Sequence, residues 1–247
     1  MIVITGASHD DVLYFGSVLM NRREDTILGR YKVLYGTLFN QDAMVVHGLY
    51  TSVLSSAVIS HILDNNFVDL VINVGKCLSV ENNIPEGDIA ISSRVIDANI
   101  DLSLFTDVVM GQIPTFDRDF EVQKDILHYL NKGMQRRSFV NSHNVTFLTS
   151  DNMSYEMIEI LKRRQSIFGI ENENVVIDYN SAGIALACTL KSVPFISIKV
   201  VENRVDRAQS VETYSKVLDR YIDLGKAVMS TINDIGRNDI LEGEFHG

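Results

Sequence analysis

Runs of consecutive apolar residues alternate along the chain with segments whose apolar residues recur every three or four positions. The runs at 1–5, 70–74 and 175–177 are short and continuous, which is typical of strands buried on both faces. The segment 51–63 has helical spacing instead, with its apolar side chains on one side. This alternation predicts a mixed β-sheet flanked by helices.

The same pattern predicts the remaining elements and a single domain. Residues 101–120 have weak periodicity and predict a long loop of the functional or interfacial kind. Residues 132–142 are polar and predict a surface connection. We expect one α/β domain over 1–235 and a polar tail over 236–247. The expected strands are 1–5, 31–38, 43–47, 70–74, 89–95, 145–149, 175–177 and 195–201, and the expected helices are 12–19, 51–63, 122–130, 155–164, 181–185 and 211–235.

Composition narrows the choice of partner. The 247 residues carry a net charge of −10, which argues against nucleic acid or an anionic membrane as the main partner. Cys77 and Cys188 are too few for a disulfide framework and lack metal-ligand spacing, so neither a metal nor a cofactor is expected. No apolar run approaches about 20 residues, and the start of the chain has a strand pattern rather than that of a signal peptide. We therefore expect a cytoplasmic protein with a small-molecule ligand.

Polar residues gather where two predicted strands end. Asp178, Tyr179 and Asn180 follow the run 175–177, and Glu202, Asn203 and Asp206 follow the run 195–201. Ligands of open α/β sheets bind at the carboxyl ends of strands, so these residues are the first candidates for a site. The alternative is that they are strand ends and helix caps without chemistry.

The same stretch carries a resemblance to a known family. The segment Ile177–Ala185 (IDYNSAGIA), then Val193-Pro194-Phe195 and the segment ENRVD at 202–206, resembles V-D-M-E-A-A-A-I-A, V-P-F and S-D-x-A-D of the purine nucleoside phosphorylase superfamily. The most similar branch is the 5'-methylthioadenosine/S-adenosylhomocysteine nucleosidases. This resemblance implies a three-layer αβα fold with a central twisted mixed sheet, and hydrolysis of a purine N-glycosidic bond. Two carboxylates of the motif are replaced, because the ribose-binding Glu falls on Asn180 and the catalytic Asp on Asn203.

The start of the chain extends the resemblance. Residues 6–12 (GASHDDV) resemble G-A-M-E-E-E-V, where the Glu that orients the attacking water falls on Asp11. Aspartate keeps the carboxylate but is one methylene shorter, a displacement of about 1 Å that matters for a positioned water. The alternative is a carboxylate that stabilises the first turn of a helix through its dipole.

The loop after the run 70–74 departs from the family pattern. Relatives continue from the glycine as S-A-G-G-L, whereas Lys76-Cys77-Leu78-Ser79-Val80 follow Gly75 here. The larger side chains fill space that a substrate would use. Lys76 either neutralises a nearby carboxylate, binds an anion, or extends its ammonium group to water.

The resemblance also assigns residues of the predicted loops. Phe105 corresponds to a residue that packs against the base, and Ser154 and Tyr155 fall where relatives have a base-contacting loop. Gln112–Pro114 resemble part of a G-Q-L-P loop that crosses to a partner subunit, which implies a homodimer. The alternative for Phe105 and Tyr155 is ordinary packing.

The expected chemistry leaves two hypotheses. Asparagine donates a hydrogen bond but no proton at neutral pH, so Asn203 only contacts the leaving base. Glu202 is one carboxylate that can compensate and Asp206 is the other, although the resemblance implies that Asp206 braces the loop. His9, Asp10 and Asp11 do not form a phosphate site, so hydrolysis is favoured over phosphorolysis. The protein is then either a divergent nucleosidase or a catalytically impaired relative that binds a nucleoside or a base, or serves as an interaction module.

Overall fold

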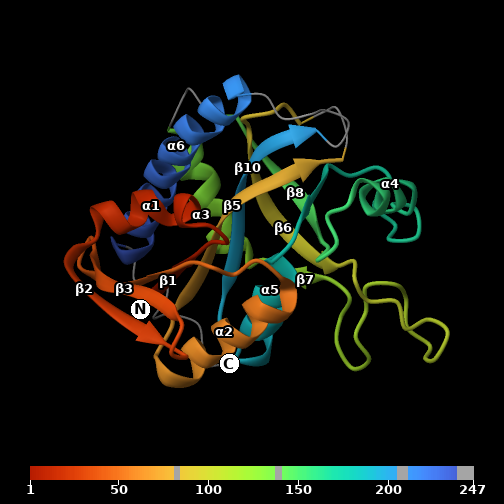
Figure 1. The fold of residues 1–247 in the computed structure, drawn as a ribbon, viewed down its shortest axis with the longest axis horizontal. Helices are drawn as coiled ribbons and strands as arrows, with labels where there is room; N and C mark the ends of the chain where they lie inside the picture. Colours follow the sequence, from red (N-terminus) through yellow and green to blue (C-terminus); the bar gives the residue numbers. More distant parts are fainter. Residues whose placement is uncertain (81–83, 137–140, 205–210, 238–247) are drawn as a thin grey trace.

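The computed structural model describes residues 1–80, 84–136, 141–204 and 211–237. Within them the chain forms ten strands and six helices (Figure 1). The strands are β1 (Ile2–Thr5), β2 (Met20–Ile27), β3 (Tyr31–Leu38), β4 (Gln41–Val46), β5 (Leu70–Ser79), β6 (Ile89–Asp97), β7 (Phe120–Glu121), β8 (Ser142–Thr149), β9 (Val175–Asp178) and β10 (Phe195–Arg204). The helices are α1 (His9–Val18), α2 (Ser52–Asn65), α3 (Lys124–Gln135), α4 (Tyr155–Arg163), α5 (Ser181–Leu190) and α6 (Val211–Arg237).

All ten strands belong to one mixed sheet that partly closes on itself. Its order is β10-β6-β8-β9-β5-β1-β4-β3-β2, with β7 paired to β6. Because β10 also pairs in parallel with β5, the strands β5, β9, β8, β6 and β10 form a closed ring. The strands β1, β4, β3 and β2 extend from this barrel as an open sheet (Figure 1).

Helices cover the sheet from two sides. α6 packs against α1, α3 and β10 on one side, and α2 packs against α5 on the other (Figure 1). The second contact requires a glycine, since a β-carbon at Gly183 would lie 1.9 Å from the backbone oxygen of Ser52. Among the described residues, no helix is both long and apolar enough to cross a membrane.

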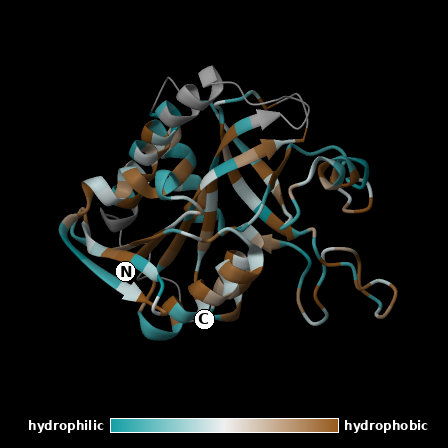
Figure 2. Cartoon of the chain, in the orientation of Figure 1, coloured by the Kyte–Doolittle hydropathy of each residue, from teal (hydrophilic) through white to brown (hydrophobic). Residues whose placement is uncertain are grey.

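The mixed α/β fold and the central sheet are confirmed, and the predicted elements correspond closely to the observed ones. The strand β2 was not predicted, because its side chains are exposed on both faces and lack an alternating pattern. Figure 2 shows this outer strand in teal, whereas the central strands are mostly brown. It is held by antiparallel pairing with β3.

Several predicted boundaries differ from the observed ones, and two of the differences change the interpretation of a segment. β5 continues past Gly75 to Ser79, because β10 pairs along its whole length, so Lys76 lies in a strand and not in a loop. α3 continues to Gln135 into the predicted surface connection, with Met134 buried against the core. The predicted tail over 236–247 lies outside the described residues from position 238 onward.

Candidate functional site

A cluster of buried polar side chains lies where β5, β8, β9 and β10 meet the start of α5. We call it the polar cluster, and each member is at most 1% exposed. Buried polar groups are stable only when they are hydrogen-bonded, and these side chains bond mainly to one another. Its members are Asn73, Thr149, Asp178, Asn180, Ser181, Ser197 and Lys199.

A buried ion pair occupies the centre of the polar cluster. The ammonium nitrogen of Lys199 is 3.3 Å from Oδ2 of Asp178 and 2.8 Å from Oδ1 of Asn180. Asp178 also accepts hydrogen bonds from Thr149 at 2.7 Å and from the Ser181 hydroxyl. Both charges are therefore compensated, which a buried pair requires because its desolvation is costly.

The amide of Asn180 is used inside the protein. Its oxygen accepts hydrogen bonds from Lys199 and, at 3.1 Å, from Nδ2 of Asn73, and its nitrogen donates to the backbone oxygen of Leu49 at 2.8 Å. An amide oxygen has two lone pairs, and both have donors here. Asn180 is thus a structural link between α5, β5 and β10.

A second carboxylate, Asp11, is held close to the polar cluster. It accepts hydrogen bonds from the backbone N–H of Ser8 at 2.8 Å and from the hydroxyl of Tyr221 on α6 at 3.0 Å. Burial and the adjacent Asp11 raise the pKa of Tyr221, so its hydroxyl keeps its proton and acts as the donor. Ser8 and Asp11 also form the capping box that starts α1.

Gly75 separates this carboxylate from the buried ammonium group. A β-carbon at Gly75 would lie 3.2 Å from Oδ2 of Asp11 and 3.5 Å from Nζ of Lys199. The glycine has φ of +149°, a conformation that other residues rarely adopt. A side chain at this position would therefore crowd the carboxylate of Asp11 and approach the ammonium group of Lys199, and the glycine lets both groups lie close to the backbone of β5.

A second lysine, Lys76, follows Gly75 in β5 and forms an ion pair. Lys76 donates to Oε1 of Glu202 at 3.0 Å, with side chains 35% and 10% exposed, respectively. The ring of Tyr179 lies with its centroid 5.8 Å from Nζ of Lys199, within the range of a cation–π contact. Burial raises the pKa of Tyr179, and the carboxylates of Asp11, Asp178 and Glu202 raise it further. These charges thus converge on the ends of β5, β9 and β10.

Comparison with known proteins places this architecture in a family. The family model described as the phosphorylase superfamily matches residues 1–232. The chain belongs to the phosphorylase superfamily. Both the order of the motifs and the fold agree with this assignment.

Individual members of the superfamily share the fold at low identity. A 5'-methylthioadenosine/S-adenosylhomocysteine nucleosidase from Exiguobacterium sp. is 22% identical over 227 residues, which cover 92% of this chain and 95% of that protein. The nucleosidase of Colwellia psychrerythraea in complex with adenine has a TM-score of 0.81 at 23% identity, covering 94% of this chain and 93% of that one. The futalosine hydrolase of Helicobacter pylori has a TM-score of 0.82 at 16% identity, covering 94% and 97%. Each is similar to this chain over nearly its full length.

The structure brings five predicted site residues of this superfamily member into one region. They are Asp11, Lys76, Tyr179, Asn180 and Glu202. Asn203 lies in β10, but its side chain is not described, and Asp206 lies outside the described residues.

The other predicted residues have different surroundings. Phe105 is 84% exposed in the single chain, and its loop projects from the sheet (Figure 1), so its contact with a base stays a prediction. Ser154 caps α4 by accepting from the backbone N–H of Met157, and Tyr155 is exposed in the first turn. These roles are local to a helix start.

Sequence reasoning did not select Lys199. Its signal was a single lysine in the apolar run 195–201, where one face of a buried strand has no access to water. A lysine at such a position needs a buried acceptor, and Asp178 and Asn180 supply it. A polar residue inside a continuous apolar strand was therefore the available clue.

Proposed function

We propose that this protein hydrolyses the N-glycosidic bond of a purine-type nucleoside at the ends of β5, β9 and β10, with Asp11 orienting the attacking water. The observation that supports the proposal best is that the Asp11 carboxylate and the Lys199 ammonium group both lie beside one backbone position, Gly75. A water there would donate to the carboxylate and accept from the ammonium group. Its lone pair would be positioned for attack on the sugar carbon.

The charges of the site suit a ribose that becomes positive in the transition state. The carboxylates of Asp11, Asp178 and Glu202 outnumber the ammonium groups of Lys76 and Lys199. A net negative environment lowers the energy of an oxocarbenium-like sugar. As water attacks and the bond to the base breaks, Asp11 accepts the water proton. The departing base takes its proton from solvent, because Asn203 can only donate a hydrogen bond to it.

The substrates that we propose are methylthioadenosine or S-adenosylhomocysteine, the compounds for which related nucleosidases are named. Tyr179 would lie against the sugar, and Glu202 would accept a hydrogen bond from the substrate in exchange for Lys76. We further propose that the chain is a homodimer that uses the loop containing Gln112–Pro114. The exposure of Leu104 and Phe105 supports this, since two large apolar side chains are more stable when another subunit covers them.

A second candidate function is binding of a nucleoside or a base without turnover. It is favoured by the amide of Asn180, whose oxygen is already bonded to Asn73 and Lys199. That oxygen would accept a ribose hydroxyl only if Lys199 or Asn73 moved. The Lys76–Glu202 ion pair adds a second rearrangement that a substrate must cause. An oxocarbenium-like sugar depends on such acceptors more than a bound base does, so these costs lower turnover more than they lower base binding.

Base release and ligand binding measured on one preparation distinguish these functions. We expect the protein to release adenine from methylthioadenosine or S-adenosylhomocysteine, and Asp11→Asn to lower the rate by about a hundredfold or more. Adenine should also raise the melting temperature of the wild type and of Asp11→Asn. Adenine binding without base release from any nucleoside of a broad panel would establish the second function.

The neighbouring residue provides a matched control. Asp10 is exposed on the same helical turn, so Asp10→Asn removes the same charge without entering the polar cluster. We expect it to keep the wild-type rate. Equal losses in the two variants would contradict the role proposed for Asp11.

A further inference from the structure

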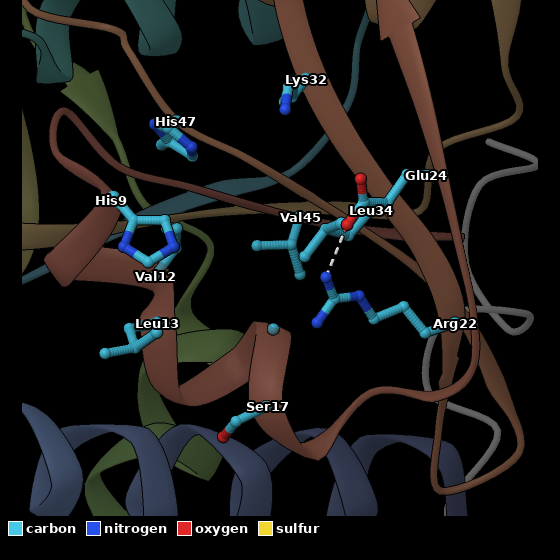
Figure 3. A pocket seen from close by; sticks show the side chains of 11 residues that line it. His9, Val12, Leu13, Ser17, Arg22, Glu24, Lys32, Leu34, Val45 and His47 are labelled. Carbon is cyan, nitrogen blue, oxygen red and sulfur yellow. Dashed lines mark hydrogen bonds and ion pairs between the residues drawn. The ribbon is translucent and has the colours of Figure 1, made fainter.

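A second cavity lies between α1 and the strands β2, β3 and β4, on the open part of the sheet (Figure 3). Its volume is about 320 Å³, at the lower end of the range for small-molecule sites. We call it the hairpin pocket. Its lining includes His9, Arg22, Lys32, Leu34, Val45 and His47.

The hairpin pocket and the Asp11 carboxylate lie on different faces of α1. His9, Leu13 and Ser17 line the pocket and are spaced four residues apart, so they form one stripe of the helix. Asp11 has its carboxylate directed to Ser8 and to Tyr221 on α6 instead. A ligand in the hairpin pocket would therefore not occupy the proposed nucleosidase site beside Gly75.

Basic groups surround an apolar floor in this pocket. Figure 3 shows the two imidazoles on one side, the Arg22 guanidinium group on the other, and Leu34 and Val45 between them. The imidazoles of His9 and His47 pack edge to face with centroids 5.3 Å apart. The arrangement has the two parts of a small-molecule site, an apolar surface and convergent polar groups.

The charge of the pocket is opposite to that of the whole chain. Arg22 and Lys32 are positive and Glu24 is the carboxylate that lines the pocket with them, whereas the chain has a net charge of −10. Arg22 uses one N–H for Glu24, at 2.6 Å, and a guanidinium group has five. Further donors therefore remain for a ligand oxyanion between Arg22 and Lys32.

We propose that the hairpin pocket binds a small organic anion, with its oxyanion between Arg22, Lys32 and the two histidines and its apolar body on Leu34 and Val45. The oxyanion is a carboxylate or a phosphate monoester, because either accepts several hydrogen bonds from a guanidinium group. The volume fits a body of about the size of one aromatic ring. This site is additional to the proposed nucleosidase site and does not depend on it.

Calorimetric titration of the full chain tests the proposal. The probes are phenyl phosphate and benzoate, with benzamide as the uncharged counterpart of benzoate. We expect one of the two anions to bind and benzamide to bind at least about tenfold more weakly, since it lacks the charge. The preferred anion identifies the chemical class. No binding of either anion at millimolar concentration would overturn the proposal.

Variants locate the binding. Arg22→Gln should lower the affinity for the anion at least about tenfold. The double variant Arg22→Gln/Glu24→Gln, which leaves the net charge unchanged, should lower it by a similar factor. Arg23→Gln is the matched control, because Arg23 lies over the ring of Tyr35 instead of in the hairpin pocket. Equal affinities of the Arg22 and Arg23 variants would overturn the proposal. Loss of binding in Lys76→Met would also overturn it, because the anion would then bind at the proposed nucleosidase site.

A spectroscopic readout separates direct contact from a change in overall charge. The ring protons of His9 and His47 should shift on addition of the anion, whereas those of His61 on α2 should not. The signals are assigned with single His→Gln variants. Uniform small shifts of all histidines would contradict a bound anion at this place.

Discussion

The polar cluster and the hairpin pocket both pair a basic side chain with a carboxylate, and they differ in access to water. Lys199 and Asp178 have side chains 1% and 0% exposed, whereas Arg22 and Glu24 are 47% and 55% exposed. The buried pair is fixed by further hydrogen bonds from Thr149 and other cluster members. The exposed pair is solvated and can exchange partners.

This difference shows that one kind of ion pair can have two roles: a buried pair stabilises the fold, and an exposed pair can bind a ligand. Removing one member of a buried pair leaves a charge without compensation, at high cost. Removing one member of an exposed pair costs little, because water replaces the partner. The polar cluster therefore holds the strands in place around the proposed site, while the hairpin pocket keeps donors that a ligand can reach.

The largest expected effect is on stability and comes from Lys199→Met. The substitution leaves Asp178 buried without its cation, so we expect the free energy of unfolding to fall by about 3–5 kcal/mol. Urea denaturation measures the change. The double variant Lys199→Met/Asp178→Asn should recover part of the loss, because it removes the uncompensated charge. A loss below about 1 kcal/mol in the single variant would show that the buried pair is not integral to the fold.

A smaller effect is expected at the contact between α1 and α6. Tyr221→Phe removes the hydroxyl that donates to Asp11, and a hydrogen bond to a charged group contributes about 1.5–3 kcal/mol. Tyr14→Phe is the matched control at the same helix contact, since the Tyr14 ring packs against Gly225 of α6. Urea denaturation should show a larger loss in the free energy of unfolding for Tyr221→Phe than for Tyr14→Phe. Similar losses would contradict a specific contribution of the Tyr221 hydroxyl.

Arg22→Gln should change the free energy of unfolding by less than about 0.5 kcal/mol. Its ion pair with Glu24 is exposed at both ends, so little stability depends on it. The same denaturation experiment applies. Together with the expected loss of anion affinity, this result would show that Arg22 contributes to ligand binding and not to the stability of the fold. A loss comparable to that of Lys199→Met would refute the distinction between the two regions.

The smallest effect concerns pH and His47. Burial and the neighbouring His9 lower the pKa of His47 from its ordinary 6.5, while Asp11 opposes this. The unfolded chain then binds the proton more readily than the folded one. Stability from the neutral imidazole is complete above about pH 6.5 and is lost as the pH falls through the lower folded-state pKa. His47→Gln should therefore lose less stability than the wild type between about pH 8 and 5. If the free energies of unfolding of His47→Gln and of the wild type change in parallel with pH, His47 does not make this contribution.

The sequence predicted the fold well because apolar periodicity determines most of it. Runs such as 70–74 and 175–177 are strands in the structure, and the motif around Asn180 led to the superfamily. Strand β2 was missed because packing on β3 determines it, while its own side chains face water. A pattern that depends on burial cannot detect a strand that is not buried.

The site was predicted only in part. Asp11, Tyr179 and Asn180 were selected from motifs, and the structure brings them near one another. The saturated hydrogen bonds of Asn180 depend on Asn73 and Lys199, which lie far away in sequence. The hairpin pocket likewise forms only when α1 packs on β2, β3 and β4. Neither feature has a local signature.

The closed ring of strands has a consequence for how the chain is made. β10 fills the place between β5 and β6, so the edge of β5 lacks this neighbour until residues 195–204 have been synthesised. Parallel pairing between such distant segments is slow to form and exposes apolar strands in the meantime. The barrel can close only after β10 has been synthesised, and a chain that stops before β10 would present an unpaired edge suited to aggregation. Folding of the barrel is therefore coupled to synthesis of β10.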